Sequence, residues 1–210
     1  ASSALNITVD TAAPAAPSVS AITDDTGTAS DGITSDNQLI ITGTAEANAS
    51  VEVFIDAGSI GTATADGSGN WSFDHTGTTL ADGSYAITAA ATDASGNTSS
   101  TSSALNITVD TAAPVAPAVT TITDDTGTAS DGITSDNQLI ITGTAEANAS
   151  VEVFIDAGSI GTTTADGSGN WSFDHTSTTL ADGSYAITAA ATDASGNTSA
   201  TSSALNITVD

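Results

Sequence analysis

An internal repeat spans almost the whole chain. Residues 11–110 match residues 111–210 at a fixed offset of 100 positions. The copies differ at seven pairs of positions: Ala15/Val115, Ser18/Ala118, Ser20/Thr120, Ala21/Thr121, Ala63/Thr163, Gly77/Ser177 and Ser100/Ala200. A period this long exceeds those of the common solenoid repeats and equals the size of a whole domain, so each copy can bury its own core. The sequence therefore predicts two similar domains, residues 11–110 and 111–210, arranged end to end.

Each repeat is built from short runs rich in valine, isoleucine, threonine and aromatic residues. Glycine, asparagine, aspartate and serine separate these runs, and no helical pattern with a period of 3.6 residues interrupts them. Seven strands are predicted in the first copy, at residues 18–23, 38–44, 50–55, 59–65, 70–74, 84–93 and 100–109. Seven antiparallel strands in about 100 residues are typical of an immunoglobulin-like β-sandwich. The predicted fold class is all-β, with tandem seven-stranded immunoglobulin-like sandwiches.

The segment Asp93–Asn97 sets the boundaries of the repeats. Its Asp, Ser, Gly and Asn residues favour a tight loop, so segment 100–109 should pair with segment 84–93 and end the first repeat. Residues 2–10 carry the same letters as residues 102–110. We therefore expect residues 1–10 to be the last strand of a preceding, truncated repeat.

The charge of the chain limits its partners. It has no lysine or arginine and 25 acidic residues, which gives a formal net charge of -25. Such a surface repels nucleic acid. Clustered carboxylates must be spread out in water or neutralised by bound cations, because no basic side chain is present to pair with them. With no cysteine, any metal is expected to bind oxygen, and divalent cations are favoured.

The apolar residues exclude two further classes. A hydrophobic fraction of 39% in a regular pattern is typical of a folded chain and not of a disordered one. No apolar run approaches the roughly 18 residues that a membrane span needs. The sequence therefore predicts folded domains without membrane insertion.

Carboxylates gather at the predicted joints between repeats. In such a sandwich, the start of the first strand and every second connection between strands lie at one end of the domain. The last strand finishes at the other end. The carboxylate at the end of one repeat should therefore meet two carboxylates of the next, and these three can supply part of the six to eight oxygen ligands of Ca²⁺. The candidate ligands are Asp110, Glu146 and Asp193 at one joint, and Asp10, Glu46 and Asp93 at the other.

A second acidic group lies between the first two predicted strands. A structureless connection of this length is uncommon in a small domain unless something orders it, and calcium could do so. The candidate ligands are Asp24, Asp25, Asp31 and Asp36, with Asp124, Asp125, Asp131 and Asp136 in the second copy. The alternative is a solvated acidic turn rich in threonine and glycine. Mg²⁺ fits less well, because it requires tighter octahedral geometry and retains its water.

The remaining distinctive residues predict no catalytic site. Trp71 and Phe73 alternate with Ser72, which indicates that both aromatic rings fill the core. His75 is expected at the surface. A nucleophile would have to be a serine or threonine activated by the one histidine of each repeat, with no Lys, Arg or Cys nearby. We therefore predict that the chain is not an enzyme and has no small-molecule substrate.

Several short strings together resemble a known family. They are Val109-Asp-Thr-Ala-Ala-Pro114, Ile122-Thr-Asp-Asp125, Gly143-Thr-Ala-Glu146, Gly169-Asn-Trp-Ser-Phe173 and Ala191-Thr-Asp193 followed by Gly196-Asn197. This set is similar to the bacterial Ig-like repeats of giant secreted adhesins of the RTX class, which includes biofilm and ice-binding adhesins. The resemblance covers the whole chain. It implies calcium-bound extender domains outside the cell, at the bacterial cell surface, which hold a ligand-binding tip away from the cell.

Two functions remain open. One is a spacer rigidified by calcium, whose partners are the neighbouring identical repeats of the same chain. The other is a calcium-dependent binding module that recognises a glycan, a protein or a surface directly. Near-identity of the copies favours the spacer, because each identical module adds length, whereas a receptor site needs to occur only at the tip.

Overall fold

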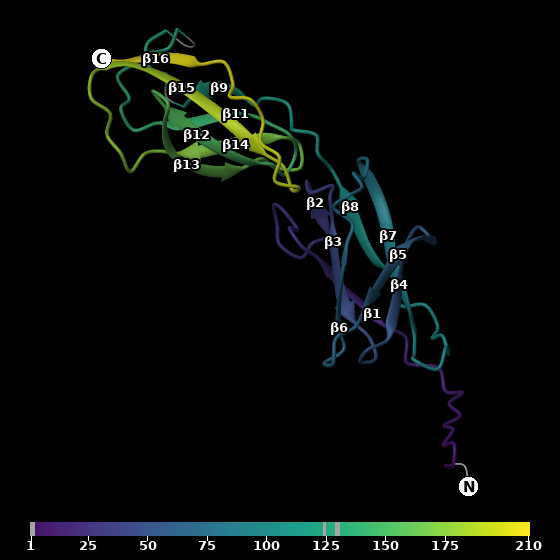
Figure 1. Ribbon diagram of the computed structural model, residues 1–210. Helices are drawn as coiled ribbons and strands as arrows, with labels where there is room; N and C mark the ends of the chain where they lie inside the picture. Colours follow the sequence, from purple (N-terminus) through teal and green to yellow (C-terminus); the bar gives the residue numbers. More distant parts are fainter. Residues whose placement is uncertain (1–2, 124, 129–130) are drawn as a thin grey trace. The chain divides into compact units, whose positions relative to one another are not determined.

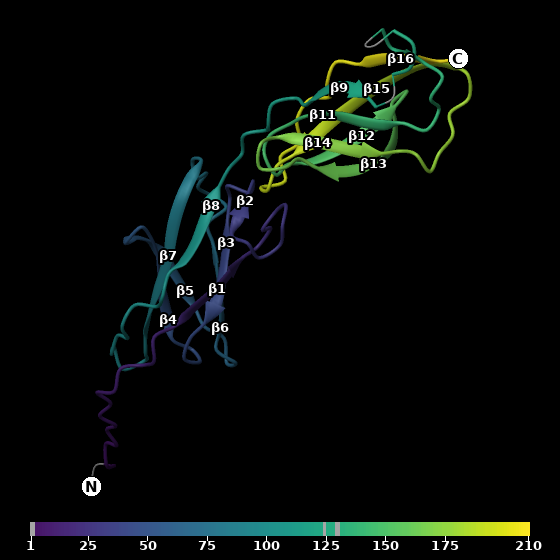
Figure 2. The ribbon, with the colours of Figure 1, turned by 180° about the vertical axis from the view of Figure 1, so that it is seen from behind.

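The computed structural model describes residues 3–123, 125–128 and 131–210. The chain divides into two compact units, residues 1–110 and 111–210. Each unit is a sandwich of two layers of strands (Figures 1 and 2). Every regular element in the described residues is a β-strand. In these residues there is therefore no helix long and apolar enough to cross a membrane. The all-β immunoglobulin-like architecture predicted from the sequence is confirmed.

In the first unit, one sheet has three strands and the other has five. The strands are β1 (Ser18–Ile22), β2 (Ile33–Thr34), β3 (Ile40–Thr44), β4 (Ser50–Ile55), β5 (Gly58–Thr64), β6 (Asn70–Asp74), β7 (Gly83–Thr92) and β8 (Leu105–Val109). Their orders are β1-β3-β6 and β2-β8-β7-β4-β5. Neighbouring strands are antiparallel, except that β2 runs parallel to β8.

The second unit repeats this topology. Its strands are β9 (Ala118–Ile122), β10 (Ile133–Thr134), β11 (Ile140–Thr144), β12 (Ser150–Ile155), β13 (Gly158–Thr164), β14 (Asn170–Asp174), β15 (Gly183–Thr192) and β16 (Leu205–Val209). They form sheets in the orders β14-β11-β9 and β10-β16-β15-β12-β13. In the described residues each unit thus has eight strands instead of the predicted seven, because the two-residue strands β2 and β10 are too short to give a sequence pattern.

The last strand of the first unit begins later than the predicted segment 100–109. Upstream of β8, serine hydroxyls replace part of the regular ladder. The Ser99 hydroxyl accepts a hydrogen bond from the N–H of Ala91, and the Ser102 hydroxyl accepts one from the N–H of Ala89, both at 3.0 Å. The same two serines donate their own N–H groups to those alanine carbonyls at 2.8 Å. This segment therefore follows β7 without forming a regular strand.

The core lies between the two sheets of each unit. In the first unit Leu39, Ile41 and Val51 have no exposed surface, and Trp71 is only 3% exposed. Phe73 is half-buried and packs against this cluster. The prediction that the aromatic side chains of β6 serve the core is therefore confirmed.

The turn between β4 and β5 holds two residues in the left-handed region. Asp56 and Ala57 have φ values of 48° and 65°, a pair that favours glycine at the second position. Replacing Ala57 with glycine should raise the free energy of unfolding of this unit by about 1 kcal/mol, because the Cβ strain is relieved. Denaturant titration measures the change. The matched control is Ala94→Gly in another exposed loop, which should lower stability slightly; a loss of stability in both variants would contradict the argument.

Candidate functional site

The loop after β7 is closed by its own side chains. The Asp93 Oδ1 accepts hydrogen bonds from the backbone N–H groups of Ser95 and Asn97, both at 2.8 Å. The side-chain amide of Asn97 donates to the Asp93 Oδ2 at 2.9 Å. Chiefly through this amide, the loop holds the pKa of Asp93 below its usual range. Asp93 is thus an ionised acceptor in a fixed position.

Asp10 lies against the same loop. The side-chain amide of Asn97 also donates to the backbone carbonyl of Asp10, at 3.2 Å. The Ser95 hydroxyl donates to the Asp10 Oδ2 at 3.4 Å. The other oxygen, Oδ1, accepts the N–H of Ala12 at 3.0 Å. The structure therefore brings together two of the three carboxylates predicted for this joint, because Asp10 contacts the loop that contains Asp93.

Glu46, the third predicted ligand, is exposed in the connection between β3 and β4. Ser50 at the start of β4 pairs with Thr92 at the end of β7, so Glu46 and Asp93 lie at the same end of the unit, as their topology predicts. In the part of the chain that the structure describes, no three Asp, Glu or His side chains are close enough to hold a metal. Calcium binding by Glu46, Asp10 and Asp93 stays a prediction.

The other predicted joint uses residues from both units. Asp110 ends the first unit, where its N–H donates to the carbonyl of Thr34 at 2.9 Å. In the second unit Glu146 is exposed between β11 and β12. Asp193 follows β15, and its two oxygens accept the backbone N–H and the side-chain amide of Asn197, both at 2.9 Å. A calcium site that combines Asp110, Glu146 and Asp193 also stays a prediction.

The connection between β1 and β3 is ordered around Thr34, whose side chain is fully buried. The Thr34 hydroxyl donates to the carbonyl of Asp24 at 2.9 Å and accepts the N–H of Asp36 at 3.0 Å. It also accepts the N–H of Thr26 at 3.3 Å. A buried hydroxyl and the pairing of β2 with β8 therefore supply order in this connection that the sequence pattern did not reveal. Ordering of the connection by calcium stays a prediction.

The acidic side chains of this connection also bond to its backbone. Asp31 and Asp36 each use Oδ1 to accept the N–H two residues further on, at 2.9 and 3.0 Å. Asp25 uses Oδ2 to accept the N–H of Ser30 at 2.7 Å. The carboxylates are therefore held by the loop, and each presents one oxygen to neutral backbone donors.

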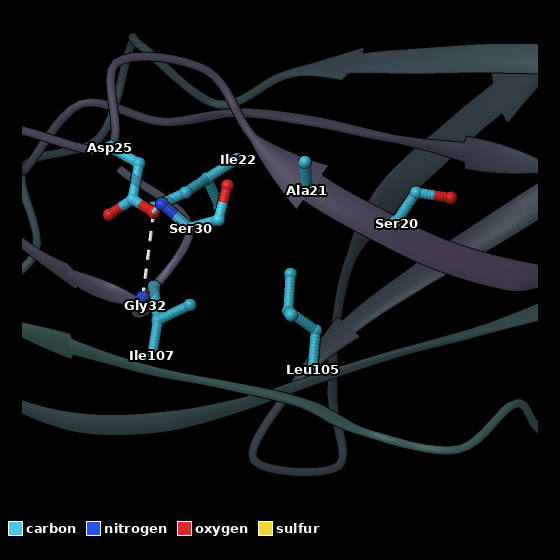
Figure 3. A pocket seen from close by; sticks show the side chains of 8 residues that line it. All are labelled: Ser20, Ala21, Ile22, Asp25, Ser30, Gly32, Leu105 and Ile107. Atoms are coloured by element: carbon cyan, nitrogen blue, oxygen red, sulfur yellow. Dashed lines mark hydrogen bonds between the residues drawn. The ribbon is translucent and has the colours of Figure 1, made fainter. Parts of the chain in front are cut away.

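The second oxygen of Asp25 differs from the first. Oδ1 is buried and has no hydrogen-bond partner among the described residues. Asp25 lines a cavity of about 120 Å³. Figure 3 shows its carboxylate at one end of this cavity, with the other oxygen directed to Ser30 and Gly32 and with Leu105 at the far side. The chain has no Lys or Arg that could satisfy this oxygen. A carboxylate oxygen is the type of ligand that Ca²⁺ prefers, and calcium binding by Asp25 stays a prediction.

The second copy has the same local bonds and a smaller cavity. Asp131 and Asp136 again accept the N–H two residues on, at 2.9 and 3.0 Å. Asp125 lines a cavity of about 70 Å³, whereas Asp124, the remaining predicted ligand, lies outside the described residues. The smaller volume is accounted for by larger side chains that line the second cavity, because threonine replaces Ser20 and Ala21 at positions 120 and 121.

Sequence reasoning about charge missed two neutral residues that organise these loops. Asn97 bridges Asp10 and Asp93, and Thr34 holds the connection between β1 and β3. The Asp-x-Ser-x-Asn spacing of the β7–β8 loop was a usable signal, because an aspartate at the first position commonly accepts N–H groups further along its loop. Thr34 gives no such signal, since one threonine in a threonine-rich connection looks like its neighbours.

Comparison with known proteins places these units in a family. The family model "Bacterial Ig-like domain" matches residues 12–111 and 113–210. No curated relative matches the sequence. Among solved structures, the fibronectin(III)-like modules of Clostridium thermocellum CbhA are similar, with 18% identity over 90% of this chain and 93% of that chain and a TM-score of 0.50.

Two adhesin structures are also among the matches, at lower TM-scores. A bacterial ice-binding adhesin of 1.5 MDa is 24% identical over 94% of this chain and 66% of that chain, with a TM-score of 0.46. A tetra-tandem repeat from the extending region of a large adhesion protein is 24% identical over 93% of this chain and 49% of that chain, with a TM-score of 0.35. On the family match, which spans both repeats, the chain belongs to the bacterial Ig-like domain family.

Proposed function

We propose that the chain is a pair of calcium-rigidified extender repeats from a large secreted bacterial surface adhesin of the RTX class. In this role the repeats are extracellular and hold a distal ligand-binding region away from the cell. The observation that carries the proposal is the equivalence of the two units. They share one topology, and none of the seven positions at which they differ is buried.

Equivalent units suit a spacer. No fully buried residue differs between the copies, so both keep the same buried core and each copy adds the same length. The cavities beside Asp25 and Asp125 are small, at about 120 and 70 Å³, whereas wider surface hollows of about 340 to 490 Å³ lie elsewhere on the units. The equivalence of the two copies therefore favours a mechanical role over recognition by each repeat.

Calcium is the proposed stiffening agent. Asp25 would hold one ion with its buried Oδ1, together with other acids of its connection, and Asp10, Glu46 and Asp93 would hold another at the end of the unit. Each ion supplies positive charge in a chain that has no basic side chain. Two negatively charged repeats would otherwise repel each other across a short linker, and domains with small interfaces move freely by default.

Small-angle scattering of the whole chain tests this role. In the wild type, calcium should increase the maximum dimension and narrow the distribution of distances relative to EDTA. Asp110→Asn should abolish that response while both repeats remain folded, because Asp110 is a proposed ligand between them. The matched control is Asp210→Asn, which makes the same change at a position that no repeat follows within these 210 residues. An identical calcium response in both variants would reject the proposed joint.

A further inference from the structure

The segment that leads into the first unit is attached to it at several points. Asp10 contacts the β7–β8 loop through its carbonyl and its carboxylate. The side chain of Asp10 also accepts the N–H of Ala12. Further along, Pro14 and Pro17 are buried, and the chain then enters β1. The lead-in is therefore part of the folded unit from Asp10 onward.

Asn97 is the central donor in this attachment. Its single amide nitrogen lies 3.2 Å from the Asp10 carbonyl oxygen and 2.9 Å from the Asp93 Oδ2, so its two N–H groups can serve two acceptors at once. The loop around it is closed by backbone hydrogen bonds. The Asp93 N–H donates to the Asn97 carbonyl at 3.0 Å, and the Gly96 N–H donates to the Asp93 carbonyl at 3.2 Å. The amide is thus held in place before Asp10 docks.

The unit contains a second loop of the same design at the same end. In the loop between β5 and β6, the Asp66 Oδ1 accepts the N–H groups of Ser68 and Asn70, at 2.8 and 2.9 Å. The side-chain amide of Asn70 approaches the Asp66 Oδ2 at 3.5 Å. Asn70 and Asn97 therefore have the same internal role, and the contact with Asp10 distinguishes Asn97.

We propose that Asn97 is a docking residue that fixes the lead-in segment to the β7–β8 loop without a metal ion. Neutral donors are suited to this task. The chain has no Lys or Arg, so the repulsion between the nearby carboxylates of Asp10 and Asp93 must be offset by such donors or by bound cations. The amide bonds to both residues and so keeps them together in the absence of calcium. The attachment consequently has a hydrogen-bonded layer that includes two of the proposed calcium ligands but does not itself need an ion.

Backbone NMR relaxation of the full chain in EDTA tests this inference. In the wild type, residues 11–13 should have order parameters near the rigid value of about 0.85, and in Asn97→Ala they should fall below about 0.6. Asn70→Ala removes the same type of intraloop amide and should leave residues 11–13 rigid. Equal mobility of residues 11–13 in Asn97→Ala and wild type, or equal loosening by Asn70→Ala, would overturn the proposal.

A second measurement needs no variant. In the wild-type chain, the side-chain amide protons of Asn97 should exchange with solvent more slowly than those of Asn70, because only Asn97 bonds to two acceptors at short distance. Faster exchange at Asn97 would count against docking even if Asn97→Ala failed to fold. Both measurements are made without calcium, so failure of the calcium proposal would leave their outcome unchanged.

Discussion

Replacing Gly43 with alanine is expected to destabilise the first repeat severely and leave the second one intact. Gly43 of β3 lies directly opposite Trp71 of β6. A Cβ at Gly43 would clash with the backbone carbonyl of Ser18 and with the indole ring of Trp71. The carbonyl belongs to β1, which is paired with β3, so neither neighbour can move without breaking the sheet or the core.

The expected cost is about 3 kcal/mol, the upper part of the usual range for overpacking. For a domain of this size, that cost lowers the melting temperature by roughly 12 to 24 °C. Calorimetry should therefore resolve two transitions in place of two superimposed ones. The matched control is Gly67→Ala, whose Cβ would meet no atom within 4 Å. A Gly43→Ala protein that still melts like the control would show that the sheet adapts more easily than its geometry indicates.

Calcium is expected to raise the melting temperature of both repeats relative to EDTA. A site filled at 100 times its dissociation constant adds about 2.7 kcal/mol to the free energy of unfolding. Extracellular calcium modules bind at roughly 10⁻⁴ to 10⁻³ M, so millimolar calcium approaches this regime only for the tighter sites. Superimposable melting curves with calcium and with EDTA would remove the structural role of the ion.

The variant Asp25→Asn tests how much of the calcium-dependent gain in the free energy of unfolding depends on one side chain. The asparagine can still accept the N–H of Ser30 through its carbonyl oxygen, but it supplies no charged ligand in place of the buried Oδ1. The first repeat should therefore lose the gain from one site, while the second keeps its own. Asp56→Asn provides the control, because it removes the same charge from a turn where the carboxylate accepts the N–H of Ala86. Equal losses in the two variants would indicate a general charge effect instead of a site.

The sequence predicted the architecture well where pattern and packing agree. The bounds of β4 and β6 match the predicted segments, since alternation with a period of two places Val51 and Trp71 inward without ambiguity. Prediction failed where single polar side chains take over the role of the backbone. The hydroxyls of Ser99 and Ser102 replace ladder carbonyls, so an alternating run need not be a strand.

The candidate sites were predicted less completely than the fold. Topology placed Glu46 and Asp93 at one end of the unit, because loop positions follow from strand order. Charge alone, however, could not show that Asn97 would bridge Asp10 and Asp93 or that one oxygen of Asp25 would be buried. Both features depend on side-chain rotamers and on loop shape, which neutral donors determine.

The parallel pairing of β2 with β8 determines how a repeat responds to tension. β2 follows the first strand of the unit, and β8 is its last strand. The two strands run in the same direction. Pulling on the two ends therefore drags these strands past each other along their common axis. The bonds from Thr108 to Gly32 and from Asp110 to Thr34 lie across that direction and are loaded together in shear, so they must break at the same time and not one after another. A two-residue strand can in this way act as a mechanical clamp in a tether.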